Sequence, residues 1–308
     1  MGEFREAIIV GGGPAGLTAG IYLKRAGIDA VLLEKGIVGG APMSTEHVEN
    51  YPGFPEGVTG RELMGRMAEQ ARHCGLVIKE FSGVEQISRT DDAFVVTTGE
   101  GAFESPGLIV TTGTVPKKLG IPGEEEFQGR GISYCATCDG MFFRGLDVAV
   151  IGGGDAAVEE GLTLANMARR VHVIHRRDQL RAQKILQERA FKNSKMEFFW
   201  NKAPVRISGK DHVESIILED TKTHELTEVP INGVFFYVGS KPDTAFLGTL
   251  VDRDESGFVI AGEDLSTRTE GLFMAGDARR KTLRQITTAV GDGALAAVNL
   301  ERYILGKR

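Results

Sequence analysis

The sequence is poor in cysteine, basic charge and long apolar runs, and each shortage excludes a class of protein. Three cysteines in 308 residues are too few for a disulfide framework and favour a reducing compartment. Lys and Arg number 36 against 42 Asp and Glu, and the resulting charge of −6 argues against a nucleic-acid-binding surface. No run approaches the roughly 18 apolar residues of a membrane span, and residues 1–6 carry no apolar signal segment. We therefore expect a cytoplasmic protein that binds neither nucleic acid nor membrane.

Glycine, by contrast, is abundant. The chain has 41 glycines, far above the average share of about 7%. They occur in clusters without a fixed period, which predicts tight turns and close backbone approaches rather than disorder. At roughly 100–200 residues per domain, the length predicts two domains.

An internal repeat is the most informative feature. An apolar strand at 7–10 is followed by Gly-Gly-Gly-Pro-Ala-Gly, a helical pattern, and a second strand that ends at Glu34. The same order returns at 148–151, with Gly-Gly-Gly-Asp-Ala-Ala and a strand that ends at His175. The distance from first glycine to last residue is equal, since 34 − 11 = 23 and 175 − 152 = 23. Two such units in register predict an α/β protein with two Rossmann-like dinucleotide-binding domains and parallel sheets.

The order of the remaining elements predicts that one domain is inserted into the other. Further elements are expected as strands at 94–98, 108–111 and 233–238, a strand at 272–277 that leads into a polar turn, and a helix at 287–303. Breaks at 112–116 and 239–242 separate these elements into an outer domain, 1–115 with 245–308, and an inner domain, 116–244. Two sequential domains are the alternative arrangement.

The first glycine-rich turn has the features of a site for an unphosphorylated dinucleotide. Its glycines allow the bend and the approach of a pyrophosphate, and the following helix N-terminus supplies N–H donors. Glu34 can accept hydrogen bonds from both ribose hydroxyls, so this turn suits FAD or NAD. The candidate residues are Gly11, Gly13, Pro14, Ala15, Gly16, Glu34 and Lys35.

The second turn differs at the position whose side chain contacts the ribose. His175 replaces the acid there, and three arginines follow it. Guanidinium groups bind a phosphate bidentately, so this turn suits NADPH, with a solvated basic helix start as the alternative. Asp155 either places a negative charge near the phosphates or caps the helix. The candidate residues are Gly152, Gly154, Asp155, Ala156, His175, Arg176, Arg177 and Arg181.

A Cys-x-x-Cys pair lies between the two nucleotide units. Cys135 and Cys138 could form half a zinc site or a redox pair, but zinc needs two more ligands. The third cysteine, Cys74, stands alone beside His73, so we predict no metal and a dithiol–disulfide exchange. Asp139 adjoins the pair as a proton donor to a leaving thiolate or as a turn residue.

Together these motifs resemble the low-molecular-weight thioredoxin reductases over essentially the whole chain. The matching segments are 11–16, 49–57, 135–140, 152–160, 175–182 and 275–277, followed by Arg284-Gln285. The resemblance implies an NADPH-dependent thioredoxin-disulfide reductase, a flavoprotein that passes electrons from NADPH through FAD and a Cys135–Cys138 disulfide. The electron acceptor would be a thioredoxin or thioredoxin-like protein, and the enzyme would be a homodimer.

The resemblance also implies residue roles. The outer domain would bind FAD and the inner domain NADPH, with Asp277 on the FAD ribitol and Asp139 as the acid–base group. The residues implied to lie at FAD are Gly40, Asn50, Gly276, Asp277, Arg284, Gln285 and Ile286. One departure concerns Ala41-Pro42-Met43, which stands where the family commonly carries a glutamine and puts one flavin-side contact in question.

Three other functions compete with this interpretation. A dithiol oxidase of similar fold would not need the arginines that follow His175, and a ferredoxin–NADP reductase would not need the cysteine pair. A non-enzymatic redox-sensing module would leave two nucleotide sites without a purpose.

Overall fold

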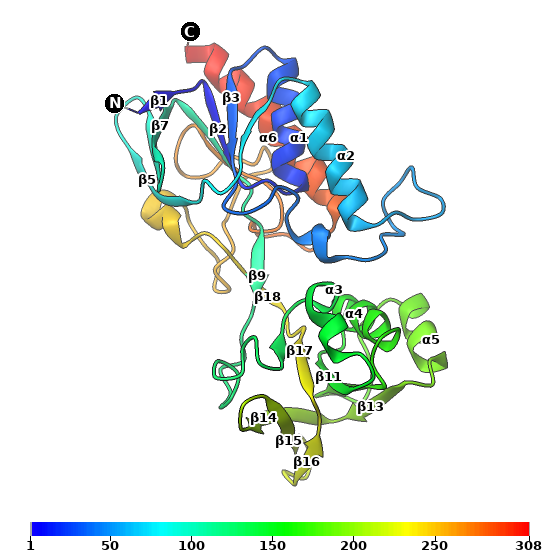
Figure 1. The fold of residues 1–308 in the computed structure, drawn as a ribbon. Coiled ribbons are helices and arrows are strands. Elements are labelled where there is room, and N and C mark those ends of the chain that lie inside the picture. The colour runs from blue at the N-terminus through cyan, green and yellow to red at the C-terminus, as the bar shows by residue number, and fades with distance from the viewer. Residues whose placement is uncertain (1, 308) are drawn as a thin grey trace. The chain divides into compact units, whose positions relative to one another are not determined.

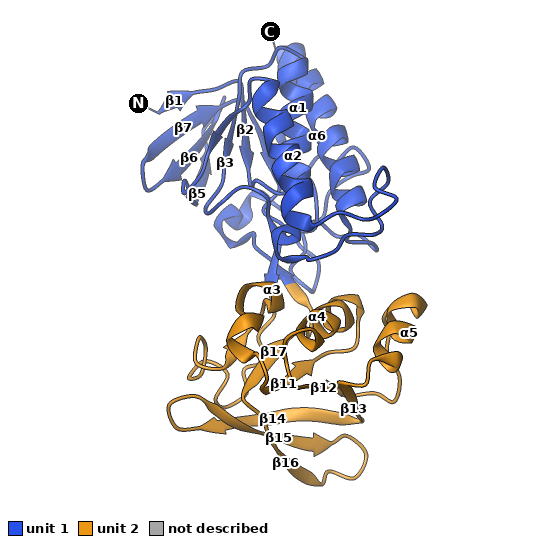
Figure 2. Ribbon diagram, turned by 45° about the vertical axis from the view of Figure 1, so that its right-hand side comes forward, with its two compact units in different colours: residues 1–115, 241–308 blue, residues 116–240 orange. Residues whose placement is uncertain are grey.

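The computed structural model describes residues 2–307 and divides into two compact units (Figure 2). Unit 1 comprises Met1–Val115 and Lys241–Arg308, and unit 2 comprises Pro116–Ser240. The chain thus leaves unit 1 once and returns to it, with the return at Lys241 rather than at 245. The two crossing segments, β9 (Thr114–Pro116) and β18 (Ser240–Pro242), pair in a two-stranded sheet.

Unit 1 is built on a parallel sheet in the order β19-β8-β2-β3-β4. Its strands are Ala7–Val10 (β2), Ala30–Leu33 (β3), Val77–Lys79 (β4), Gly107–Val110 (β8) and Leu272–Met274 (β19). Three helices lie close together beside it in Figure 1, namely Pro14–Arg25 (α1), Gly60–His73 (α2) and Ile286–Lys307 (α6). The four residues of β2, β3 and β8 are all buried, as expected for strands of a covered parallel sheet.

A smaller sheet in the order β1-β7-β6-β5 completes unit 1. Its strands are Glu3–Phe4 (β1), Val84–Arg89 (β5), Phe94–Thr98 (β6) and Gly101–Ser105 (β7), and two 3-10 segments, Ala41–Ser44 (η1) and Ala245–Leu250 (η3), also belong to the unit. Phe94, Val96 and Phe103 from this sheet share an apolar core with the parallel sheet and with Leu247 of η3.

The helices of unit 1 begin where local chemistry favours them. Pro14 occupies the first turn of α1, where its missing N–H costs nothing. The Thr59 side chain caps α2 by accepting a hydrogen bond from the Glu62 N–H at 3.1 Å. At Gly293, α6 lies so close to α1 that a Cβ there would stand 2.2 Å from the Ala15 carbonyl oxygen.

Unit 2 contains a second parallel sheet, in the order β10-β17-β11-β12-β13. Its strands are Ile132–Ser133 (β10), Asp147–Ile151 (β11), Arg170–His175 (β12), Met196–Trp200 (β13) and Gly233–Phe236 (β17). Its helices are Ala136–Asp139 (α3), Asp155–Ala165 (α4) and Lys184–Lys192 (α5), with a 3-10 segment at Gly140–Phe143 (η2). An antiparallel meander of Lys202–Gly209 (β14), Val213–Asp220 (β15) and Leu226–Pro230 (β16) follows β13.

The predicted α/β fold with two Rossmann-like repeats is confirmed, because β2-α1-β3 and β11-α4-β12 have the same order and parallel pairing. Several element bounds differ from the prediction, and the ends of β17 and α6 illustrate why. Strand β17 ends at Phe236 rather than 238, before Gly239 turns the chain with φ of 112°. Helix α6 extends beyond 303 because Ile304 continues its buried face. Among the helices of residues 2–307, none is long and apolar enough to cross a membrane.

Candidate functional site

The first glycine-rich turn leaves backbone donors open at the start of α1. Gly13 is the N-cap residue, and no side chain caps this helix. Gly11 has φ of 106°, and a Cβ there would lie 2.7 Å from the Thr111 carbonyl oxygen. A Cβ on Gly16 would lie 2.0 Å from the Gly11 carbonyl oxygen. Each glycine is therefore required by sterics, and the free N–H groups at the helix start suit a pyrophosphate.

Glu34 lies at the end of β3 and binds the same turn. Its Oε2 accepts a hydrogen bond from the Gly12 N–H at 2.7 Å, and its Oε1 accepts one from the Gly36 N–H at 2.9 Å. Gly40 faces the turn from another segment, since a Cβ on Gly40 would stand 3.0 Å from the Gly13 Cα. Lys35 extends away from these groups and pairs with Asp243 at 2.7 Å.

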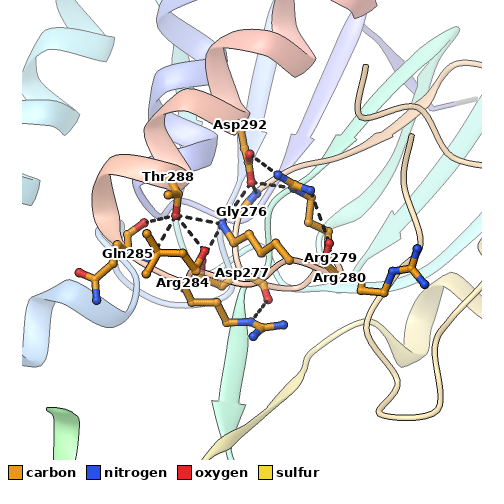
Figure 3. A network of polar contacts seen from close by, with 10 residues as sticks. Gly276, Asp277, Arg279, Arg280, Arg284, Gln285, Thr288 and Asp292 are labelled. Atoms are coloured by element: carbon orange, nitrogen blue, oxygen red, sulfur yellow. Dashed lines mark hydrogen bonds and ion pairs between the residues drawn. The ribbon is translucent and has the colours of Figure 1, made fainter. Parts of the chain in front are cut away.

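Four predicted flavin-side residues meet at the N-terminal end of α6. Asn50 Nδ2 donates a hydrogen bond to Gln285 Oε1 at 3.1 Å, across 235 residues of sequence. Arg284 Nε donates to the Asp277 carbonyl oxygen at 3.1 Å (Figure 3). The Arg284 guanidinium also lies 3.9 Å from the centre of the Phe258 ring, a cation–π contact that holds it in place. The sequence did not point to Phe258.

The Asp277 side chain carries a buried oxygen, Oδ1, whose partner is the Lys281 ammonium at 3.0 Å. Its Oδ1 is buried and has no hydrogen bond among the described residues. A carboxylate oxygen can accept more than one hydrogen bond, so Asp277 keeps acceptor capacity for a bound polar group. Together with the close glycine approaches, this fits the dinucleotide cofactor that the sequence predicts for unit 1.

The second glycine-rich turn repeats these features in unit 2. Gly154 is the N-cap residue of α4 without a capping side chain, and the space around its Cβ position is open. Gly152 has φ of 150°, and a Cβ there would lie 2.5 Å from the Tyr237 carbonyl oxygen. Asp155 does not cap the helix. Its two carboxylate oxygens instead accept hydrogen bonds from Gln183 N at 2.7 Å and Gln183 Nε2 at 3.1 Å.

The basic segment after β12 separates into a buried residue and exposed ones. Arg176, Arg177 and Arg181 are exposed, and the Arg181 N–H donates to the Gly153 carbonyl oxygen at 2.6 Å. His175 is buried, and a Cβ on Gly153 would lie 2.6 Å from its ring. Burial lowers the pKa of His175, and the nearby Arg181 and Arg177 lower it further, so the ring is neutral at pH 7. The charge available to a phosphate thus comes from the arginines.

Cys135 and Cys138 form a disulfide with an S–S distance of 2.05 Å at the start of α3. Cys138 is exposed and Cys135 is half-buried. The Ala136 N–H between them donates to Glu160 Oε2 at 3.1 Å and to the Tyr237 hydroxyl at 3.0 Å. Burial raises the pKa of Tyr237, and the Glu160 carboxylate raises it further, so the hydroxyl keeps its proton.

Asp139 is held beside the disulfide by a serine. The Ser133 hydroxyl donates to Asp139 Oδ2 at 2.6 Å and accepts a hydrogen bond from the Cys135 N–H at 3.0 Å. Helix α3 packs against α4, so the disulfide and the second glycine-rich turn belong to one body. Ser133, Glu160 and Tyr237 did not stand out in the sequence, although Glu160 lies within the 152–160 segment.

The fold and the disulfide define a class of protein, in which one unit carries a redox-active cysteine pair beside a dinucleotide turn. A family model described as pyridine nucleotide-disulphide oxidoreductase matches residues 5–293. The thioredoxin reductase of Bacillus subtilis is 43% identical over 300 residues, which cover 97% of this chain and 94% of the relative. The solved thioredoxin reductase of Lactococcus lactis is 42% identical, with a TM-score of 0.96 and coverage of 98% and 99% of the two chains. That of T. acidophilum is 32% identical, with a TM-score of 0.93 and coverage of 97% and 98%.

The chain therefore belongs to the pyridine nucleotide-disulphide oxidoreductases, and among them to the thioredoxin reductases. The resemblance inferred from the motifs is confirmed.

Proposed function

We propose that this chain is an NADPH-dependent thioredoxin-disulfide reductase. Electrons pass from NADPH through FAD to the Cys135–Cys138 disulfide, and from there to a thioredoxin or thioredoxin-like protein. The observation that carries the proposal is the disulfide in the same unit as a dinucleotide turn with three exposed arginines. The arginines disfavour a dithiol oxidase, and the disulfide disfavours a ferredoxin–NADP reductase.

FAD and NADPH are the cofactors of this family. We assign FAD to unit 1, where Glu34 and Asp277 would bind its ribose and ribitol and Asn50, Arg284 and Gln285 would lie at the ring. We assign NADPH to unit 2, where the arginines would bind its 2′-phosphate. When bound, FAD accepts a hydride from NADPH and supplies an electron pair to the disulfide.

The protein residues then carry out two disulfide exchanges. Two electrons and two protons break the Cys135–Cys138 bond and leave two cysteine thiols. One cysteine, as the thiolate, attacks the partner's disulfide and forms a mixed disulfide, and the other cysteine displaces the reduced partner and restores the starting bond. Asp139, beside the pair, would give a proton to the leaving thiolate and take it back in the next cycle.

We further propose that the enzyme is a cytoplasmic homodimer. The dimer rests on the family resemblance, and sedimentation of the holoenzyme would test it. The compartment rests on cysteine usage, because Cys74 is a free thiol and the only disulfide among residues 2–307 is the proposed redox pair.

The experiment that tests the function removes one redox cysteine. In Cys138→Ser, NADPH should still bleach the flavin, because that step needs no thiol, whereas thioredoxin reduction should be lost. Cys74→Ser is the matched control and should keep both reactions, since Cys74 lies in unit 1 outside the cysteine pair. If Cys138→Ser still reduced thioredoxin with NADPH, Cys135–Cys138 would not be the relay.

A further inference from the structure

A buried ionic cluster lies beside Gly276 and Asp277 in unit 1 (Figure 3). It consists of Asp292 on α6 with Arg279 and Lys281 from the preceding loop, and we refer to it as the Asp292 cluster. Arg279 binds Asp292 through two hydrogen bonds, Nη2 to Oδ1 at 2.7 Å and Nε to Oδ2 at 2.8 Å. Lys281 Nζ donates to Asp292 Oδ2 at 3.2 Å and to Thr288 Oγ1 at 3.3 Å.

The three charged side chains of the cluster are largely buried. The side chains of Lys281 and Asp292 are 7% and 9% exposed, and that of Arg279 is 21% exposed. Burial would raise the pKa of Asp292, but the Arg279 and Lys281 cations outweigh it and hold this pKa below its ordinary value. Desolvating such charges is costly, and an apolar cluster of equal volume is often at least as stable. Stability alone therefore does not explain why the cluster is ionic.

Asp292 also binds the backbone at Gly276, the residue before Asp277. Its Oδ2 accepts a hydrogen bond from the Gly276 N–H at 3.0 Å. Gly276 has φ of 79°, and a Cβ there would lie 3.1 Å from the Ala15 Cβ in the first turn of α1. One carboxylate thus fixes the residue that directly precedes Asp277, whose positive φ favours glycine and which faces the glycine-rich turn.

The cluster reaches the Asp277 carboxylate itself through Lys281. Lys281 Nζ lies 3.0 Å from Asp277 Oδ1, the buried oxygen that has an ion-pair partner but no hydrogen bond. The ammonium is shared between Asp277 and Asp292, so its position depends on both carboxylates. Removing the Asp292 charge would leave Lys281 paired with Asp277 alone, so neither the ammonium nor the Asp277 carboxylate would keep its present position.

We propose that Asp292 is a positioning residue for FAD, which acts through Gly276 and Lys281 to fix the position of the Asp277 carboxylate. The inference rests on the proposed assignment of FAD to unit 1. Asp292 itself touches no cofactor in this scheme. Its contribution is to fix the turn and to occupy Lys281, so that Asp277 is arranged before FAD arrives.

The test measures FAD binding to flavin-free protein rather than turnover. Asp292→Asn keeps the shape but removes the charge and replaces one acceptor oxygen with an NH2 donor. We expect the dissociation constant for FAD, measured by flavin fluorescence, to rise about tenfold or more, as for the loss of a charge-assisted contact. Arg268→Ala is the matched control, because it breaks an exposed ion pair with Asp252 in the same unit. It should leave the FAD affinity unchanged.

A second variant separates positioning from simple destabilisation. Arg279→Met combined with Asp292→Leu replaces this ion pair with apolar groups, while Lys281 keeps its ion pair with Asp277. We expect the flavin-free double variant to unfold in urea near the wild-type midpoint while it binds FAD at least about tenfold more weakly. Wild-type FAD affinity in the double variant would overturn the proposal, as would a loss of affinity explained wholly by a lower urea midpoint. A wild-type protein that binds no FAD would instead refute the proposed function.

Discussion

Arg176 and Arg177 stand in the second repeat at the positions that Lys35 and Gly36 occupy in the first. We propose that this difference in positive charge sets the choice of coenzyme. Both arginines are exposed at the end of a buried strand. A charge-assisted phosphate contact contributes about 1.5–3 kcal/mol. We therefore expect Arg176→Ala with Arg177→Ala to lower kcat/KM for NADPH on the order of 10²-fold or more. The value for NADH, which lacks the 2′-phosphate, should stay nearly constant.

Steady-state kinetics with both coenzymes checks this prediction. Arg170→Ala is the matched control, because Arg170 is an exposed arginine at the opposite end of β12, where it pairs with Glu197 at 2.9 Å. It should change neither coenzyme's kcat/KM. Equal losses with NADPH and NADH in the double variant would rule out a role in binding the 2′-phosphate.

For single residues, the sequence indicated those that stand in recognisable motifs. It missed those whose role depends on hydrogen bonds to residues distant in the sequence. Glu34 and the cysteine pair could be found because each stands at a recognisable strand end or spacing, whereas Arg284 was implied only by the family resemblance. Asp292 lies in a helix whose pattern predicts only packing, and nothing local marks its bond to Arg279. Tyr237 reaches Ala136 across 101 residues. Such partners depend on the tertiary arrangement, and no periodicity encodes them.

Among the elements, β12 carries two buried histidines, and they make the stability of unit 2 depend on pH. Burial lowers the pKa of His172, with partial compensation from Glu197, and it lowers the pKa of His175 below the ordinary 6.5. The folded unit therefore keeps both rings neutral at pH values where the unfolded chain already binds protons. The contribution of the two histidines to the free energy of unfolding is fully present above the unfolded-state pKa of about 6.5. It is lost as the pH falls from there through the folded-state pKa values.

Urea unfolding followed by fluorescence can measure this dependence. Trp200, the single tryptophan, lies on β13 and reports on unit 2. We expect a lower urea midpoint at pH 5.5 than at pH 7.5, and a smaller difference in His175→Gln. His212→Gln, an exposed histidine in the β14–β15 turn, should retain the full difference. An unchanged pH dependence in His175→Gln would show that this ring does not contribute.

The elements themselves were predictable where both faces of a strand are buried. The strands β2, β8 and β11 are short apolar runs bounded by glycine or polar turns, and each was placed to within one residue. For β19 the start at Leu272 was correct, but the strand ends at Met274, before the predicted turn. The meander β14–β16 was not predicted, because many of its positions are half-buried or exposed and its pattern is interrupted by irregular pairing near Pro204 and Ser208. The predicted strand at 233–238 extends two residues beyond β17 because Tyr237 and Val238 continue the apolar run.

For the molecule as a whole, the central claim is that two redox groups in different units work in series. The proposed FAD site lies in unit 1, whereas the disulfide and the proposed NADPH site lie in unit 2. A protein arranged in this way stores two electron pairs, one on the flavin and one on the cysteine pair. Neither a flavin enzyme without the disulfide nor a dithiol protein without the flavin would do so.

An anaerobic titration of the purified holoenzyme with NADPH tests this claim most directly. The wild-type flavin should be fully bleached only after about two equivalents of NADPH per FAD, because flavin and disulfide each take an electron pair. A variant with Cys135→Ser and Cys138→Ser should need about one. Oxidised thioredoxin should then restore the absorbance of the wild-type flavin and leave that of the variant bleached. Equal stoichiometry in both proteins, or a wild-type flavin that thioredoxin cannot reoxidise, would contradict the series of NADPH, FAD, Cys135–Cys138 and thioredoxin.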